Sequence, residues 1–324
     1  MVCISTVTFR IVINGQHSHN FRSQGGIRQG DPISPLLFVI AMEGLSRRLM
    51  AATAEQGFRF HPLCRNLKLV NLIFADDLMA FCKGHPKSVG VIMGALKEFA
   101  CNSGLQENQD KSQVFLAGVK EPHKRQIVDC TGFQEGVFPF RYLGFPISSK
   151  KWSIATCKVL IDKVSACVNS WKTRNLSYQA RCVLINSVLL TLHSYWASVF
   201  IIPKAVLKGV EQVCRKFLWG DKQAGNVGWE QVCKEKSFGG LGFKNSVLWN
   251  QAALGKQLWH IADKEDILWV KWVNQIYLRN ESIWEAQPRQ DQGWHYKQLL
   301  KVRDRLAPGV VNGRWLSGSI HVIG

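Results

Sequence analysis

The sequence predicts an α+β fold, in which a first part mixes strands with helices and a second part is all helical. Two observations predict it. A β-branched run, Phe9–Ile13, is followed by Asn14-Gly15, the strongest short signal for a β-hairpin. After residue 150, apolar residues recur at steps of three and four, and all twelve tryptophans of the 324-residue chain lie there. Because a chain of this length usually forms about two domains, we expect the domain boundary near residue 150.

The first part is predicted to contain two hairpins and two long helices. The expected elements are strands Phe9–Ile13 and Phe21–Ser23, helix Pro35–Gln56, strands Leu69–Phe74 and Leu78–Phe81, and helix Pro86–Cys101, which ends near Gly104. Helical spacing predicts that one face of the first helix packs on the core, with Arg47 and Arg48 facing away. The residues of that inward face are Leu37, Ile40, Ala41, Gly44 and Leu45.

The second part is predicted to consist of packed amphipathic helices, because its apolar residues form one-sided stripes. The stripes are Cys157, Ile161, Val164, Val168 and Trp171, then Cys182, Ile185, Leu189, Leu192 and Trp196, then Leu248, Ala252, Gly255, Trp259 and Ala262. A row of tryptophans could also form a platform on which bases stack. At helical spacing, packing in the core is the favoured interpretation.

The charge of the chain indicates a polyanionic partner. The net charge is +18, of which residues 1–150 supply +6 (17 Lys and Arg against 11 Asp and Glu) and residues 151–324 supply +12 (24 against 12). Nucleic acid is the commonest partner of such a protein, although a generally basic surface is the alternative. No apolar run is long enough for a membrane span. The ten cysteines are scattered singly, which indicates buried, reduced thiols in an intracellular protein, nuclear or cytoplasmic.

Two adjacent carboxylates interrupt an apolar hairpin in Leu72-Ile73-Phe74-Ala75-Asp76-Asp77-Leu78. Neighbouring carboxylates repel each other, and each loses water when it is partly buried. A divalent cation relieves both costs, and Mg²⁺ commonly binds through one or two carboxylates together with substrate phosphates. Taken alone, the pair is better explained as a solvated Asp-Asp turn, because turns favour aspartate.

A loop rich in glycine and proline precedes this hairpin by some forty residues. It reads Gly25-Gly26-Ile27-Arg28-Gln29-Gly30-Asp31-Pro32-Ile33-Ser34-Pro35-Leu36-Leu37-Phe38. Glycine lets a backbone approach a ligand closely, Arg28 can contact a phosphate, and Gln29 can bond a base edge or a sugar. An ordinary loop before a helix explains the glycines and prolines equally well, but not their placement ahead of the Asp-Asp hairpin.

Together these motifs resemble the reverse transcriptases of LINE-type (non-LTR) retrotransposons, in the form abundant in plant genomes. The segment Arg28–Pro35 resembles motif B of that family, where Arg28, Gln29 and Gly30 would contact template and nucleotide. Phe74–Asp77 resembles motif C, the metal-binding hairpin of the polymerase palm, where Asp76 and Asp77 would hold Mg²⁺, with Mn²⁺ as a substitute. The resemblance spans nearly the whole chain and implies an RNA-directed DNA polymerase, a nucleotidyltransferase acting on RNA template, DNA primer and dNTP.

Weaker matches follow in the family's order. Ser103-Gly104-Leu105 with Asn108 and Lys111-Ser112 resembles motif D, whose lysine is thought to protonate the leaving pyrophosphate, which points to Lys111. Phe140–Pro146, with Tyr142 and Gly144, resembles the element that holds the primer end. The resemblance implies a partial palm over residues 1–150, a helical thumb or connection region over 151–285, and the start of a zinc-binding-type segment over 286–324. Gly239–Phe243 resembles a glycine turn of the helical region.

The strand that carries motif A in the family, with another metal-binding aspartate, has no counterpart before Phe9. Asp31 is expected to shape its own loop, and Asp110 is expected to face solvent, so neither replaces that ligand. We therefore expect an N-terminally truncated fragment with little or no polymerase activity of its own. The sequence does not indicate the oligomeric state.

The sequence leaves three alternatives open. The chain could be a non-catalytic nucleic-acid-binding relic, a group II intron maturase-like protein, or the product of a decayed element that forms no stable structure. The residue sequence of motif B and the tryptophan-rich second half favour a LINE-type element over a maturase.

Overall fold

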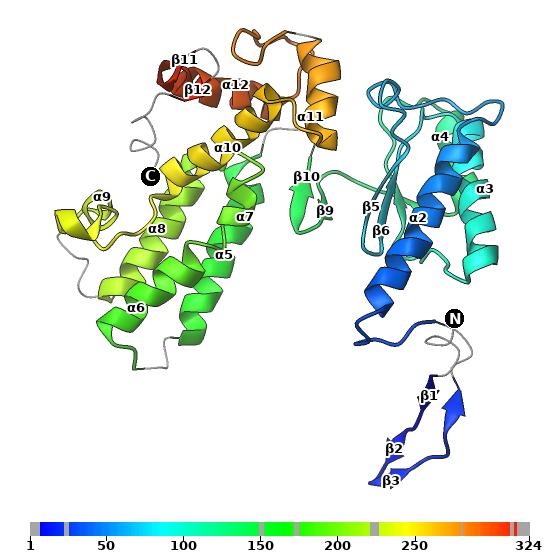
Figure 1. Cartoon of the computed structure of the whole chain (residues 1–324), viewed down its shortest axis with the longest axis horizontal. Helices are drawn as coiled ribbons and strands as arrows, with labels where there is room; N and C mark the ends of the chain where they lie inside the picture. The colour runs from blue at the N-terminus through cyan, green and yellow to red at the C-terminus, as the bar shows by residue number, and fades with distance from the viewer. Residues whose placement is uncertain are drawn as a thin grey trace. The chain divides into compact units, whose positions relative to one another are not determined.

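The computed structural model describes residues 7–22, 26–148, 152–171, 175–220, 227–279, 281–311 and 314–315. The chain divides into two compact units, Met1–Val137 (unit 1) and Phe138–Gly324 (unit 2), each drawn in Figure 1. Every strand in the described part of the chain pairs with a single neighbour, and helices make up most of the rest. The fold class is α+β, as the sequence predicts.

Unit 1 begins with a hairpin built from four short strands. These are β1 (Thr8–Phe9), β2 (Val12–Ile13), β3 (Gln16–His17) and β4 (Phe21–Arg22), with β1 paired to β4 and β2 to β3, both antiparallel. Asn14 and Gly15 join β2 to β3 with φ of +50° and +80°. Positive φ at both turn residues is the pattern of a type I′ turn, so the hairpin predicted from Asn14-Gly15 is confirmed. Ser23 lies outside the described residues.

The rest of unit 1 packs two long helices and a hairpin around one core. Its elements are α2 (Ser34–Ala52), β5 (Asn71–Phe74), β6 (Asp77–Ala80), α3 (Pro86–Ser103), β7 (Gln113–Val114), α4 (His123–Thr131) and β8 (Gln134–Glu135). The residues of the buried apolar cluster are Leu45, Leu49, Ala52, Val70, Ile92 and Ala95. Gly104 ends α3 in the left-handed conformation, and both predicted helices and the β5–β6 hairpin are confirmed.

The predicted inward face of α2 is correct only in its C-terminal half. Leu45 is buried, whereas Ile40 is 68% exposed and Gly44 is also exposed. The core of unit 1 packs against the later turns of α2, so its first turns have no covering layer in the described residues. Arg48 does not face away, since it forms an ion pair with Glu98 of α3.

Unit 2 opens with a hairpin and continues as a helical array. Its first elements are β9 (Phe140–Tyr142), β10 (Phe145–Ile147), α5 (Ile154–Trp171), α6 (Tyr178–Leu184), the π-helical η1 (Ile185–Leu189), α7 (Ser194–Ala197) and α8 (Lys204–Trp219). Then follow α9 (Trp229–Val232), the 3₁₀ turn η2 (Lys236–Phe238), α10 (Ser246–Ala262), α11 (Leu268–Val273), the π-helical η3 (Asn274–Leu278), α12 (Trp294–Leu306), the 3₁₀ turn η4 (Ala307–Gly309), β11 (Val310–Val311) and β12 (Arg314–Trp315). Three buried apolar clusters hold these helices together.

The first two predicted stripes do line the core of unit 2. Cys157, Val164 and Val168 of α5 are fully or nearly buried, and so are Ile185 and Leu189 of η1. The second stripe is not one helix, because turns at residues 190–193 separate η1 from α7.

The third stripe is correct only in part. Gly255 is buried and Ala262 packs against the core, but Leu248 is 51% exposed. The other buried residues of α10 are Ser246, Asn250, Leu254, Leu258 and Ile261. Asn250 explains the difference. Its side-chain oxygen accepts a hydrogen bond from the Ile202 amide at 2.9 Å, and its amide donates to the carbonyls of Ala197 and Phe200 at 2.8 and 2.7 Å. A buried polar side chain satisfied in this way turns its own face of the helix inward.

The tryptophan and cysteine predictions hold in part. Trp152 and Trp196 are buried and most other described tryptophans are half-buried, but Trp249 is exposed beneath Lys244, whose Nζ lies 4.1 Å from the ring centroid. All described cysteines are free thiols, and Cys101 and Cys130 are exposed rather than buried. Among the described residues, none of the helices combines the length and apolar composition that a membrane crossing requires.

The β9–β10 hairpin belongs to unit 2, although the sequence places the boundary at residue 150. The ring of Phe145 lies 4.4 Å from that of Tyr195 and 5.6 Å from that of Phe200, measured between centroids. This aromatic packing joins the hairpin to the helices that follow. The assignment of residues 151–285 and 286–324 to separate domains stays a prediction, and Gly313 lies outside the described residues.

Candidate functional site

Asp76 and Asp77 lie at the turn of the β5–β6 hairpin. The strands pair antiparallel with Phe74 opposite Asp77, so Ala75 and Asp76 form a two-residue turn. Both aspartates are exposed, while Ile73 and Leu78 pack on the core of unit 1. Apolar residues that anchor the strands therefore hold the two carboxylates at the end of a fixed hairpin.

The backbone at this turn is strained. Ala75 has φ of +51°, a left-handed conformation that costs a residue with a Cβ about 1–2 kcal/mol. Such strain persists only where the surrounding structure enforces it, and it gathers at functional sites. Here the pairing of β5 with β6 enforces it.

The hairpin packs along α2. The side-chain amide of Asn71, at the start of β5, donates a hydrogen bond of 3.2 Å to Ser46 Oγ in the later half of α2. In Figure 1 the turn of the hairpin lies beside the earlier half of that helix, which follows the glycine-proline loop. The aspartate turn and the loop thus belong to the same end of unit 1.

Hydrogen bonds within the loop itself shape the glycine-proline segment. Asp31 Oδ1 accepts from the Ile33 amide at 3.0 Å, and the Asp31 carbonyl accepts from the Ser34 amide at 3.1 Å. The buried hydroxyl of Ser34 donates to the Arg28 carbonyl at 2.6 Å. The expectation that Asp31 shapes its own loop is confirmed.

This closed loop leaves the three candidate ligand-binding residues open to solvent. Arg28, Gln29 and Gly30 are all exposed, and Gly30 has φ of +83°, which favours glycine. Gly25, at the start of the motif, lies outside the described residues. The arrangement can offer a guanidinium, an amide side chain and a bare backbone to a ligand.

Lys111 is held by a turn that Asn108 organises. Its backbone amide donates to Asn108 Oδ1 at 3.1 Å, and the hydroxyl of Ser112 donates to the Asn108 carbonyl at 2.8 Å. The Lys111 side chain is exposed, and so is Asp110, as the sequence predicts. Asn108, which the sequence singles out only as part of motif D, is therefore the residue that positions Lys111.

Tyr142 and Gly144 lie in unit 2, at the turn of the β9–β10 hairpin. Leu143 and Gly144 have φ of +48° and +81°, which is again the type I′ pattern. The hydroxyl of Tyr195 donates to the Leu143 carbonyl at 3.1 Å and fixes the turn. The structure brings Asp76, Asp77, the loop of Gln29 and Lys111 into one unit, and it places Tyr142 and Gly144 in the other.

The donor set suits a hard divalent cation in part. In the described ranges, no three or more side chains of His, Cys, Asp or Glu gather as a metal-binding group. Asp76 and Asp77 are adjacent and exposed, and two carboxylates with substrate phosphates are a common way to hold Mg²⁺. The chemistry of the pair therefore fits the ion, with further oxygen ligands to come from outside this pair.

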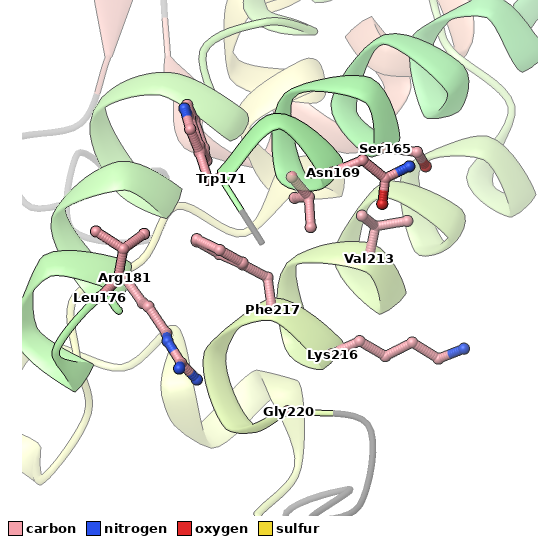
Figure 2. A pocket seen from close by; sticks show the side chains of 10 residues that line it. Ser165, Asn169, Trp171, Leu176, Arg181, Val213, Lys216, Phe217 and Gly220 are labelled. Carbon is pink, nitrogen blue, oxygen red and sulfur yellow. The ribbon is translucent and has the colours of Figure 1, made fainter. Parts of the chain in front are cut away.

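Unit 2 contains a cavity that sequence reasoning did not anticipate. It has a volume of about 530 Å³ and lies between α5, α6 and α8 (Figure 2). Its lining combines Trp171 and Phe217, whose ring centroids are 5.8 Å apart, with the basic side chains of Arg181 and Lys216. None of the residues predicted as site residues lines it, and the stripe that contains Trp171 was its only sequence signal.

The region that matches a known protein family covers unit 1 and the first hairpin of unit 2. Residues 2–147 match the family of reverse transcriptases (RNA-dependent DNA polymerases). A "Putative ribonuclease H protein" of Arabidopsis thaliana is 29% identical over 128 residues, which are 38% of this chain and 21% of that protein. The Pol polyprotein from the type-1 retrotransposable element R2 of Popillia japonica is 28% identical over 157 residues, 45% of this chain and 25% of the polyprotein.

The corresponding polyprotein of the type-2 element R2DM of Drosophila melanogaster is 30% identical over 125 residues, 38% of this chain and 11% of the polyprotein. The chain thus spans a quarter or less of the length of these three relatives. Residues 2–147, a little less than half of the chain, thus match the reverse transcriptase family, and the similarity to R2 Pol polyproteins is consistent with a LINE-type (non-LTR) reverse transcriptase fragment.

Proposed function

We propose that the chain supplies part of the site of an RNA-directed DNA polymerase, with Asp76 and Asp77 as ligands of Mg²⁺, or of Mn²⁺ in its place. One observation carries the proposal: two exposed carboxylates stand at the end of a hairpin anchored on α2, in the unit that matches the reverse transcriptase family. The expected substrates are an RNA template, a DNA primer and a dNTP.

The two aspartates can present oxygen atoms to a cation without a large cost of burial. Both side chains are exposed, so little water is lost before the ion binds. Asp76, at the turn, is proposed as the principal ligand, and Asp77, the first residue of β6, as the assisting one. A divalent cation held by Asp76 and Asp77 would supply Lewis-acid stabilisation of the charge that develops on phosphate oxygens.

The remaining candidate residues would bind and orient the reactants. The Arg28 guanidinium can contact a phosphate, and the Gln29 side chain can bond a base edge or sugar, while Gly30 lets the ligand approach the backbone. Lys111, positioned by Asn108, would donate a proton to the departing pyrophosphate. A well-placed proton donor is worth roughly 10²–10⁴ in rate.

Unit 2 is proposed as the part that holds the nucleic acid. Tyr142 and Gly144 would support the primer end, and residues 151–285 would act as a thumb or connection region for the duplex. Residues 151–324 carry net +12, from 24 Lys and Arg against 12 Asp and Glu, which suits contacts with phosphates. Residues 286–324 are proposed as the opening of a zinc-binding-type segment.

We expect the chain alone to polymerise little or not at all. Among the described residues, the turn brings together only Asp76 and Asp77, because Asp31 is engaged in its own loop and Asp110 belongs to another turn. A catalytic site that lacks one of its preorganised charged groups loses most of its electrostatic stabilisation of the transition state.

The proposal is tested by measuring dNTP binding to the full chain with Mg²⁺ and with EDTA, in the presence of a primed RNA template. Mg²⁺-dependent binding should be lost in Asp76→Asn and retained in Asp129→Asn, a matched change of an exposed aspartate on α4. Binding that needs no Mg²⁺, or that survives Asp76→Asn, would overturn the assignment of the metal ligands.

Primer extension tests the expected inactivity separately. With RNA template, DNA primer and Mg²⁺, the wild-type chain should give no more product than Asp76→Asn. Template-dependent extension by the wild type that Asp76→Asn abolishes would contradict the expected inactivity while supporting the assigned ligands. Salt-sensitive binding of the duplex without any response to Mg²⁺ would favour a non-catalytic nucleic-acid-binding protein instead.

A further inference from the structure

Five basic side chains gather at the end of the β5–β6 hairpin that is remote from Asp76. This basic cluster consists of Arg59, Lys83, His85, Lys87 and His123. It draws on four places in unit 1: the loop before β5, the segment after β6, the start of α3 and the start of α4. The rings of His85 and His123 are 5.2 Å apart between centroids.

Hydrogen bonds fix the backbone of the basic cluster. The Lys83 amide donates to the Arg59 carbonyl at 2.9 Å, and the Arg59 amide donates to Ser88 Oγ at 3.1 Å. Ser88 is fully buried, and its hydroxyl donates a hydrogen bond of 3.3 Å to the Gly57 carbonyl. His85 Nδ1 accepts from the Lys87 amide at 3.2 Å. The positions of the basic residues are thus fixed by hydrogen bonds of the backbone around them.

Its charges are not neutralised within the described part of the chain. No carboxylate there forms an ion pair with Arg59, Lys83 or Lys87, whereas the nearby Lys124 of α4 pairs with Glu135 at 2.7 Å. Burial lowers the pKa of His85, and the charges of His123, Arg59, Lys87 and Lys83 lower it further. Concentrated positive charge of this kind is relieved by an anion.

We propose that the basic cluster binds the phosphodiester backbone of a nucleic acid strand, at a contact separate from the Asp76 turn. Lys83 follows Asp76 by seven residues, of which Asp77–Ala80 form β6, so at about 3.3 Å per extended residue the two lie at most about 23 Å apart. At about 3.4 Å per nucleotide of a duplex strand, the contact lies within about seven nucleotides of the turn. The nature of the partner rests on the proposed function, whereas the existence of the site does not.

The mutational test compares two double variants of equal charge in unit 1. Arg59→Gln/Lys87→Gln removes two members of the basic cluster, and Arg47→Gln/Lys97→Gln removes one arginine and one lysine from exposed positions on α2 and α3. Binding of a labelled 20-nucleotide RNA to the full chain is measured by fluorescence anisotropy at several KCl concentrations in EDTA.

The cluster variant should bind the RNA roughly tenfold more weakly at 50 mM salt. The plot of the logarithm of the association constant against the logarithm of the salt concentration should become less steep by about 1.4, because each phosphate contact on a single strand contributes about 0.7 to the steepness. The control variant should match the wild type. Equal losses in the two variants, or no loss in the cluster variant, would overturn the proposal.

A second measurement uses the wild-type chain and needs no variant. The pKa of His85 and that of His123 are determined by NMR titration alone, with the RNA, and with inorganic phosphate at the same phosphate concentration. A bound anion favours the protonated imidazole, so the RNA should raise the pKa of His85 and bind more tightly as the pH falls. An unchanged pKa would contradict the proposal, and an equal rise with inorganic phosphate would assign the site to small anions instead.

These measurements use neither divalent metal nor dNTP. Loss of Mg²⁺-dependent dNTP binding in Asp76→Asn and loss of RNA binding in the cluster variant therefore report on different sites. If the RNA-binding test fails, the Mg²⁺-dependent dNTP-binding result still stands, and the reverse also holds.

Discussion

The two units differ in how much of their apolar surface they cover. Unit 2 contains three buried apolar clusters, and its long helices α5 and α8 carry buried residues along their whole lengths. Among its described residues, unit 1 has one such cluster, and the buried apolar residues of its helix α2 lie only in the later half of the helix. The unit that matches the reverse transcriptase family is therefore the less covered of the two.

The uncovered surface and the candidate site occur in the same part of unit 1. Leu36, Val39 and Ile40 on the first turns of α2 are more than 60% exposed, and Phe74 beside the aspartate turn is 59% exposed. Unit 2 instead presents its hairpin turn braced by the Tyr195 hydroxyl, with Phe145 buried behind it. The difference shows that unit 2 is stabilised by its packing. In unit 1, polar site residues and apolar side chains are exposed to solvent in the same region.

The largest effect is expected from the core of unit 2. Leu258→Ala on α10 should lower the free energy of unfolding by about 2–5 kcal/mol, because the fully buried side chain leaves a cavity. Leu248→Ala on the exposed face of the same helix should cost much less. Urea denaturation followed by tryptophan fluorescence checks this, and it reports on unit 2 because every tryptophan follows residue 150. Equal costs would contradict the assigned buried face.

Acid should destabilise unit 2 next most strongly. Burial, followed by the charge of Lys244, lowers the pKa of His193 to about 4, and neither ring nitrogen has a hydrogen-bond partner among the residues that the structure describes. The unfolded state binds the proton first, so the stability is complete above pH 6.5 and falls by about 3 kcal/mol as the pH drops to 4. Burial also lowers the pKa of His295 to about 4.

Substitution of His193 isolates this contribution. His193→Leu should be less sensitive than the wild type to a change from pH 7.5 to pH 4.5, as measured by urea midpoints from tryptophan fluorescence. An unchanged pH dependence in the variant would show that His193 is not the group that titrates.

A smaller, stabilising effect is expected at the aspartate turn. Ala75→Gly should raise the local stability of the β5–β6 hairpin by about 1 kcal/mol, because glycine adopts positive φ without strain. Amide hydrogen exchange at Ile73 and Leu78 measures it. Leu143→Gly is the matched change at the turn of the β9–β10 hairpin, where it should have the same stabilising effect because Leu143 also has positive φ. Faster exchange in Ala75→Gly would contradict the assigned strain.

The smallest effect tests the open face of α2. Ile40→Gln should change the free energy of unfolding of unit 1 by less than about 0.5 kcal/mol, because the side chain is already exposed. Leu45→Gln, at a buried position of the same helix, should cost several times more. Hydrogen exchange of α2 amides compares the two. Similar costs would mean that the first turns of α2 are covered in solution.

Features fixed by local chemistry could be predicted from the sequence. Asn14-Gly15 specifies its turn, Asp76 and Asp77 lie at the hairpin turn, and Asp31 shapes its own loop, because each depends on residues within a few positions. The helices α5 and α10 of unit 2 were also predictable from their stripes, whereas the second stripe spans three shorter elements, α6, η1 and α7.

Features that depend on distant packing could not be predicted. The buried face of α10 follows from the hydrogen bonds of Asn250 with residues 197, 200 and 202, which no periodicity of α10 contains. The exposure of Ile40 follows from where the core of unit 1 ends. The basic cluster joins Arg59 to His123 through the fold, and only the local run Lys83-Gly84-His85-Pro86-Lys87 hinted at it.

The central claim is that the Asp76-Asp77 turn binds a divalent cation, and paramagnetic Mn²⁺ tests it most directly. Trace Mn²⁺ added to the isotope-labelled chain should broaden the amide resonances of residues 75–78 in the wild type and leave them sharp in Asp76→Asn. With dNTP present, the broadening should extend to Gln29 and Gly30. Broadening that appears elsewhere, or that persists around residue 76 in Asp76→Asn, would contradict the account.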